Sequence, residues 1–127
     1  MAVSDLLPRM SENDWLKQLI GAMQRDGRRR GGLLRMLGWA CWHDESINAP
    51  RKCPKCRQEI SLPRSEPGFP DIVAVRGDTL YLIELKADAG RMSEPQTAWL
   101  EALRGVTQVR VAVFRPRDLD ELMEKMA

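Results

Sequence analysis

The sequence has no apolar run long enough to cross a membrane. Its longest uninterrupted apolar stretch, residues 36–42, is seven residues long, whereas a spanning helix needs about 20. The chain also opens without the charged and then apolar pattern of a signal peptide. We therefore expect a cytoplasmic protein that does not bind membranes.

Cysteine and aromatic residues are also scarce. Three cysteines in a reducing compartment exclude a disulfide framework and are expected to be free thiols or metal ligands. Hydrophobic residues make up 43% of the 127 residues and charged residues 30%, which is typical of globular proteins. We expect a loose arm at residues 1–10 and a single domain over residues 11–127, with a basic, cysteine-containing insertion at about 44–65.

The net charge of +2 is small, but the charges are unevenly divided along the chain. Residues 1–65 carry 12 Lys or Arg and 7 Asp or Glu, whereas residues 66–127 carry 8 and 11. A basic half that contacts a polyanion and an acidic half that gathers a metal cation would use this division. Two ordinary solvated faces would produce it as well.

Hydrophobic periodicity predicts helices and strands in alternation. Helices are expected from Ser11 to about Met23, around residues 33–37, and after Ser93 and Asp118, with strands at 38–43, 72–75, 80–86 and 109–113. The two central strands flank a Gly77-Asp78 turn and should form a hairpin. Residues 44–70 are too rich in proline for long regular elements. This order predicts an α/β fold with a small mixed sheet of about four strands flanked by helices.

The expected hairpin brings two carboxylates and an amine together. Asp71 opens its first strand and Glu84 lies near the end of its second, so an antiparallel turn places them side by side. Glu84 and Lys86 project from one face because side chains alternate along a strand. Carboxylates are preferred ligands of Mg²⁺ and Mn²⁺, and the carbonyl of Leu85 would add another. A structural salt bridge between Glu84 and Lys86 is the alternative.

Two more side chains are candidates, each with a structural alternative. Glu12 falls in the apolar stripe of the first helix and should point toward the sheet. An acid in the first helical turn also complements the helix dipole in solvent. Gln96 completes a capping box with Ser93, and it is also placed to reach a phosphate or a metal-bound water.

In this order the motifs are similar to the VRR-NUC branch of the PD-(D/E)XK nuclease superfamily. The matching residues are Gly68-Phe69-Pro70-Asp71, Ile83-Glu84-Leu85-Lys86, Gly90-Arg91-Met92-Ser93 with Gln96, and Arg115-Pro116-Arg117-Asp118. The resemblance runs from Ser11 to about Leu122 and is to stand-alone, phage-type members. It implies a restriction-endonuclease-like core.

The resemblance implies a Mg²⁺- or Mn²⁺-dependent DNA endonuclease in a bacterial or phage-infected cell. The implied catalytic residues are Asp71, Glu84, Lys86 and Gln96, and the implied metal ligands are Glu12, Asp71, Glu84 and the Leu85 carbonyl. Similar proteins pair as homodimers on branched or flapped DNA, such as a Holliday junction. A non-catalytic nucleic-acid-binding module with a zinc knuckle is the alternative.

Two basic segments depart from a compact member of this family. They contain the candidate DNA-binding residues Arg28, Arg29, Arg30, Arg51, Lys52, Lys55 and Arg57. Arginine and lysine contacts to phosphates give affinity without reading sequence. Solvated loops are the simpler interpretation.

The cysteines allow a structural zinc site. Cys53 and Cys56 have the C-x-x-C spacing of half a zinc knuckle, and Cys41 with His43 offers a second pair. The four residues would form a Cys₃His site, or two copies of the C-x-x-C would share one zinc between protomers. Free thiols, with Cys41 as a small core residue, are the third possibility.

Overall fold

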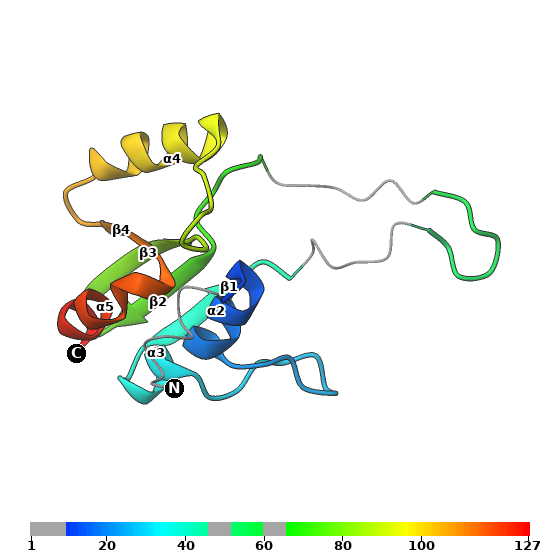
Figure 1. Ribbon diagram of the computed structural model, residues 1–127, viewed down its shortest axis with the longest axis horizontal. Coiled ribbons are helices and arrows are strands. Elements are labelled where there is room, and N and C mark those ends of the chain that lie inside the picture. Colours follow the sequence, from blue (N-terminus) through cyan, green and yellow to red (C-terminus); the bar gives the residue numbers. More distant parts are fainter. Residues whose placement is uncertain (1–9, 46–51, 60–65) are drawn as a thin grey trace.

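The computed structural model describes residues 10–45, 52–59 and 66–127. Within them, four strands form one mixed sheet in the order β1-β2-β3-β4 (Figure 1). The strands are β1 (Ala40–His43), β2 (Ile72–Arg76), β3 (Thr79–Leu85) and β4 (Arg110–Phe114). The predicted α/β fold with a small mixed sheet is confirmed.

The connections follow from strand direction. β1, β2 and β3 are antiparallel neighbours, and the predicted hairpin turns at Gly77, whose φ of 61° suits glycine. β3 and β4 are parallel, so the chain must cross from one end of the sheet to the other between them. Helix α4 (Glu94–Arg104) makes this crossover and contacts β4.

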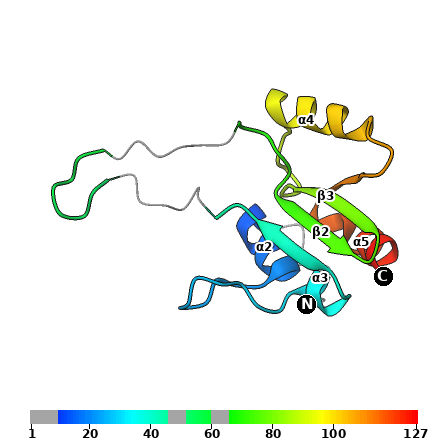
Figure 2. The same ribbon diagram turned by 180° about the vertical axis from the view of Figure 1, so that it is seen from behind.

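The other helices are α2 (Glu12–Ile20), α3 (Leu33–Met36) and α5 (Leu119–Met126), the last preceded by the 3₁₀ turn η3 (Pro116–Asp118). The views from both sides show α2 and α5 on one face of the sheet (Figures 1 and 2). None of the helices in the described ranges has the length and apolarity to cross a bilayer.

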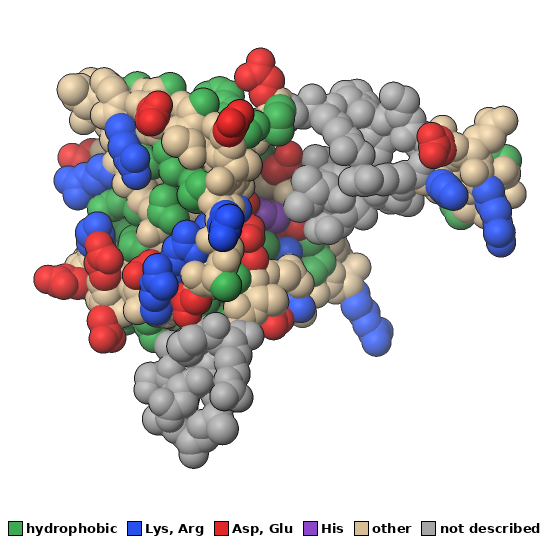
Figure 3. Space-filling view, turned by 45° about the horizontal axis from the view of Figure 1, so that its top comes forward, with side chains coloured by type: hydrophobic (Ala, Val, Ile, Leu, Met, Phe, Trp, Pro, Cys, Tyr) green, Lys and Arg blue, Asp and Glu red, His purple; other side chains and the backbone are tan. Residues whose placement is uncertain are grey.

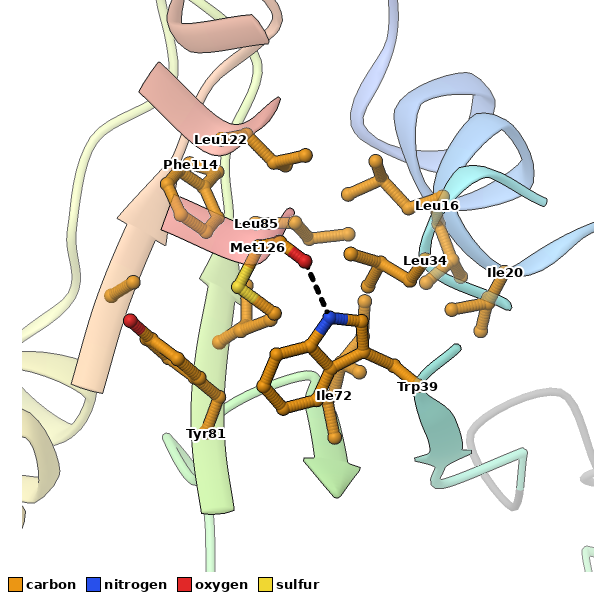
Figure 4. Close-up of a cluster of buried hydrophobic side chains, with 14 of the residues drawn as sticks. Leu16, Ile20, Leu34, Trp39, Ile72, Tyr81, Leu85, Phe114, Leu122 and Met126 are labelled. Carbon is orange, nitrogen blue, oxygen red and sulfur yellow. Dashed lines mark hydrogen bonds between the residues drawn. The ribbon is translucent and has the colours of Figure 1, made fainter. Parts of the chain in front are cut away.

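The hydrophobic core lies between that face and these helices. Alternate residues of the strands, such as Ile72, Ile83 and Phe114, are buried there together with Leu19 and Leu122. Two indoles tie the layers together. Trp39 Nε1 donates to the Met126 carbonyl at 2.8 Å (Figure 4), and Trp15 Nε1 donates to the Phe114 carbonyl at 3.0 Å. Helix α2 is thereby fixed to the sheet at the end of β4.

The first helix is shorter than predicted. It ends at Ile20 because Gly21 takes a φ of 87° and leaves the helical conformation. Met23, expected on the apolar stripe, is 42% exposed and pairs with Arg29 in an isolated β-bridge. Most of the predicted N-terminal arm, residues 1–9, and residues 46–51 and 60–65 of the insertion lie outside the described residues.

Candidate active site

Three carboxylates meet at one end of the hairpin. The pairing of Ile72 with Ile83 places Asp71 opposite Glu84, and Glu12 approaches from the first turn of α2. One ligand oxygen of each residue lies within 4.8 Å of the other two. Among the described residues, this is the group of acidic, histidine or cysteine side chains that has the spacing to hold a metal ion.

Glu84 is the most unusual of the three because its side chain is fully buried. Its Oε1 accepts a hydrogen bond from Gln96 Nε2 at 3.1 Å, whereas its Oε2 is buried without a partner when the carboxyl groups are ionised. Burying an ionised carboxylate oxygen costs roughly several kcal/mol of folding free energy unless a cation or a proton satisfies it. The donor set therefore fits a hard divalent cation.

The pKa values of the acids agree with this geometry. Burial, followed by the charge of Asp71 and a hydrogen bond to it, raises the pKa of Glu84 to about 9, against the opposing charge of Lys86. Burial and then the charge of Asp71 raise the pKa of Glu12, again against Lys86. Without a metal ion, Glu84 therefore holds a proton at neutral pH.

Backbone and amide groups fix the orientation of the acids. The Leu85 N–H donates to Asp71 Oδ2 at 2.8 Å. Gln96 completes the expected capping box, since its Oε1 accepts from the Ser93 N–H at 2.9 Å. Its Nε2 donates to Glu84, a contact that was not predicted. The capping box of α4 therefore sets the amide that holds Glu84.

Lys86 lies directly after β3 and is only 8% exposed. A Cβ on Gly90 would come within 3.4 Å of the lysine Cδ, so the loop after β3 runs close along the lysine stem. Arg115 fixes this loop, because its guanidinium donates to the carbonyls of Ala87, Asp88 and Gly90 at 2.7, 3.2 and 2.7 Å.

The loop before Asp71 is locked against α4. Gly68 has a φ of 95°, and a Cβ there would lie 2.4 Å from the backbone of Pro95. Phe69 makes an edge-to-face contact with Trp99 at 5.2 Å between ring centroids. These contacts hold the helix that carries Gln96 against the loop that carries Asp71.

A pocket of about 230 Å³ opens beside the acids. It is lined by Glu12, Asn13, Leu16, Arg29, His43, Asp71 and Leu85. His43 Nδ1 lies 3.0 Å from Glu45 Oε1, and Arg29 Nε donates to the same oxygen at 2.7 Å. Burial opposes the ionisation of Glu45, but the hydrogen bonds from Arg29 and His43 outweigh it and lower the pKa of this carboxyl.

The arginines of residues 28–30 differ in what their side chains contact. The Arg29 side chain is 8% exposed, ion-paired with Glu45 and bonded to the Gly21 carbonyl at 2.9 Å, so it is part of the fold and the pocket rather than a free phosphate contact. Arg30 pairs with Asp26. Arg28 remains exposed.

The other predicted basic contacts belong to the insertion. Lys52, Lys55 and Arg57 are exposed, and Arg51 lies outside the described residues. In Figure 3 the segment 52–59 stands apart from the sheet and carries basic side chains. The sequence analysis did not predict the pocket. Arg29 comes from the loop after α2, whereas His43 and Glu45 come from the end of β1 and the residues after it, and no local motif indicates that these two segments meet.

The structure does not bring the four predicted zinc ligands together. Cys41 lies in β1 with its thiol 3.7 Å from the Trp39 carbonyl, and His43 is bonded to Glu45. Cys53 and Cys56 lie in the separate segment 52–59 (Figure 1). Backbone N–H groups of Cys56 and Lys55, with the Cys56 thiol, lower the pKa of the Cys53 thiol.

Comparison with known proteins identifies the family. The model of the VRR-NUC domain matches residues 12–118, which include all three acids, Lys86 and Gln96. Neither the curated proteins nor the solved structures gave a match. Because the domain match covers most of the chain, it assigns a nuclease-type function with DNA as the substrate: the chain belongs to the VRR-NUC domain family.

Proposed function

We propose that this protein is a divalent-metal-dependent DNA endonuclease that hydrolyses phosphodiester bonds. The observation that supports the proposal best is the buried, unpartnered Oε2 of Glu84 beside two further carboxylates and a lysine. A protein that only binds DNA gains nothing from three acids at the point where a phosphate must approach, because like charges repel. This favours catalysis over a non-catalytic binding module.

Glu12, Asp71 and Glu84, together with the Leu85 carbonyl, would hold Mg²⁺ or Mn²⁺. Such an ion supplies Lewis-acid chemistry, since it makes water a nucleophile near neutral pH and offsets charge on the phosphate. Gln96 keeps Oε1 of Glu84 occupied, which directs Oε2 of the same carboxylate to the ion. The Leu85 N–H holds Asp71 in the same way.

Lys86 would act on the attacking water or on the phosphate. Its stem is confined by the loop at Gly90, and the residue is almost fully buried beside the acidic cluster. A lysine there can orient the water and accept or share its proton, and it neutralises part of the charge of the scissile group. Its charge already opposes the raised pKa values of Glu12 and Glu84.

We extend the proposal to branched or flapped DNA and to a pair of chains as the working form. The exposed face of β1 and β2 supports pairing, because Trp42 is 55% exposed and Val75 is 41% exposed on the side opposite the core. Exposed apolar side chains on adjacent strands are suited to contact with another protein surface. The basic segments would then lie on both sides of a DNA branch.

The test compares purified wild-type protein with Glu84→Ala and with Glu94→Ala, an exposed acid of α4. Hairpin, flap, fork and four-way substrates are incubated with Mg²⁺ or Mn²⁺, and binding is measured separately in Ca²⁺. We expect wild type and Glu94→Ala to cut branched substrates, and Glu84→Ala to bind without cutting. Metal-dependent cleavage by Glu84→Ala would refute the site, and wild-type binding without cleavage in either metal would leave the binding module as the function.

A further inference from the structure

Residues 52–59 form a tight turn that the nuclease site does not use. Lys52 and Glu59 pair in an antiparallel bridge, and the Cys53 N–H donates to the Gln58 carbonyl at 2.9 Å. The Arg57 N–H closes the turn on the Cys53 carbonyl at 2.8 Å, with Arg57 at a φ of 59°. A non-glycine residue in this conformation is uncommon, and such residues cluster where the backbone is shaped for a ligand.

The turn favours the thiolate form of one cysteine. The backbone N–H groups of Cys56 and Lys55, together with the Cys56 thiol, lower the pKa of the Cys53 thiol. Amide groups that point at a sulfur stabilise its thiolate, which is the form that binds metals. Both cysteines lie in the one turn that the Arg57 N–H closes on the Cys53 carbonyl, as two ligands of one ion must.

We propose that Cys53 and Cys56 form half of a Cys₄ zinc site, and that the same two residues of a second copy of this chain complete it. Structural zinc takes four ligands in a tetrahedron, and cysteine pairs with C-x-x-C spacing are its usual source. Two identical pairs related by a twofold axis supply four sulfurs without any change in the sheet.

Within the described ranges, one chain does not supply two further zinc ligands next to this turn. It has three cysteines and one histidine. His43 is bonded to Glu45 and lines the pocket beside the acids, and Cys41 is half-buried in β1. Among the described residues, no third ligand atom stands near Cys53 and Cys56 in a metal-binding arrangement.

The charges around the turn suit such a centre. Four thiolates and one Zn²⁺ carry a net charge of about −2. Each copy places Lys52, Lys55 and Arg57 beside the sulfurs against the single acid Glu59, and all four side chains are exposed. The basic side chains of two copies would repel one another in a contact without zinc. Around a negatively charged zinc thiolate centre, they are instead attracted to the centre.

The site is independent of the proposed nuclease chemistry, because neither cysteine belongs to the acidic cluster. Its tests therefore use zinc and mass rather than cleavage. Tag-free protein is loaded with Zn²⁺ under reducing conditions, and its metal content and native mass are measured. We expect one zinc for two chains, and tetrahedral thiolate absorption bands when Co²⁺ replaces zinc.

The matched variants are the double substitution Cys53→Ser with Cys56→Ser, and Cys41→Ser. The double variant should lose the zinc and the cobalt bands while keeping its melting temperature, and Cys41→Ser should keep both metals. One zinc per single chain that disappears in Cys41→Ser or His43→Ala would overturn the proposal in favour of a site within one chain. Reduced protein that binds no zinc would also overturn it.

Discussion

Gln96 donates a hydrogen bond from Nε2 to Oε1 of Glu84 over 3.1 Å, and this contact joins helix α4 to the centre of the acidic cluster. The other end of the same amide accepts from the Ser93 N–H. The amide cannot rotate without losing one of the two bonds. A helix cap therefore determines which oxygen of a buried carboxylate is left for a ligand.

Replacing Gln96 with alanine should weaken the metal site. The side chain contacts Glu84, a proposed metal ligand, and removing such an orienting partner typically costs about 10–100-fold in metal affinity or activity. We expect the Mg²⁺ concentration for half-maximal nicking to rise by a factor in this range, as measured by a titration of the cleavage rate.

Ser93→Ala is the matched control for that substitution. It removes the hydroxyl that accepts from the Gln96 N–H but leaves the Gln96 amide on Glu84. A lost cap costs about 1 kcal/mol of stability. The melting temperature should therefore fall while the Mg²⁺ dependence stays near that of wild type. Equal losses of metal affinity in both variants would mean that Gln96 acts only through the helix.

The metal-free protein should become less stable as the pH rises. Folding raises the pKa of Glu84 from an ordinary 4.5 to about 9, so the folded state binds a proton that the unfolded state releases. The stabilisation is present in full below about pH 4.5 and is lost as the pH rises toward 9. We expect the melting temperature in a chelator to decline over this window, with a flatter profile for Glu84→Gln.

Added Mg²⁺ or Mn²⁺ should reverse that decline at pH 8, because the cation replaces the proton on Glu84. Binding should release protons, which calorimetry in buffers of different ionisation enthalpy measures. Identical pH profiles for wild type and Glu84→Gln in the chelator would show that Glu84 is not protonated in the folded protein.

The sequence predicts the contact of Asp71 with Glu84 because only a hairpin turn separates them. Once the turn at Gly77 is placed, alternation along the strands determines which side chains meet. The strand order and the parallel pairing of β3 with β4 were not predicted, because a helix between two strands is compatible with either direction of the second strand. The fold class and the acidic cluster can therefore be predicted from local patterns alone.

The surroundings of the site cannot be predicted in that way. A basic loop looks suited to DNA, yet Arg29 turns inward because Glu45 and the Gly21 carbonyl, both outside its local motif, accept its hydrogen bonds. The spacing of Cys41 and His43 matches a zinc pair but does not show how far they are from Cys53. The helix pattern includes Met23, while the φ of Gly21 ends the helix earlier.

Arg28 and Arg29 are adjacent but should respond differently to alanine. Arg29→Ala leaves Glu45 without its main partner, and lost hydrogen bonds to a charged group cost about 1.5–3 kcal/mol. Its melting temperature should drop. Arg28 is exposed, so Arg28→Ala should keep the melting temperature and reduce the salt dependence of DNA binding by about one phosphate contact. Equal thermal stability of the two variants would contradict the buried role of Arg29.

Gly68→Ala tests whether the loop before Asp71 must touch α4. Both Gly68 and Gly27 have a positive φ, of 95° and 78°, but a Cβ on Gly27 meets nothing within 4 Å, whereas one on Gly68 falls 2.4 Å from the Pro95 backbone. Gly27→Ala should therefore lower the free energy of unfolding only by the cost of holding an alanine at positive φ, about 1–2 kcal/mol. Gly68→Ala should lower the free energy of unfolding, measured by chemical denaturation, by clearly more than Gly27→Ala. It should also raise the Mg²⁺ concentration that cleavage requires, because the clash moves Gln96 away from Glu84. Equal losses in the two variants would show that the loop and α4 separate without consequence for the metal site.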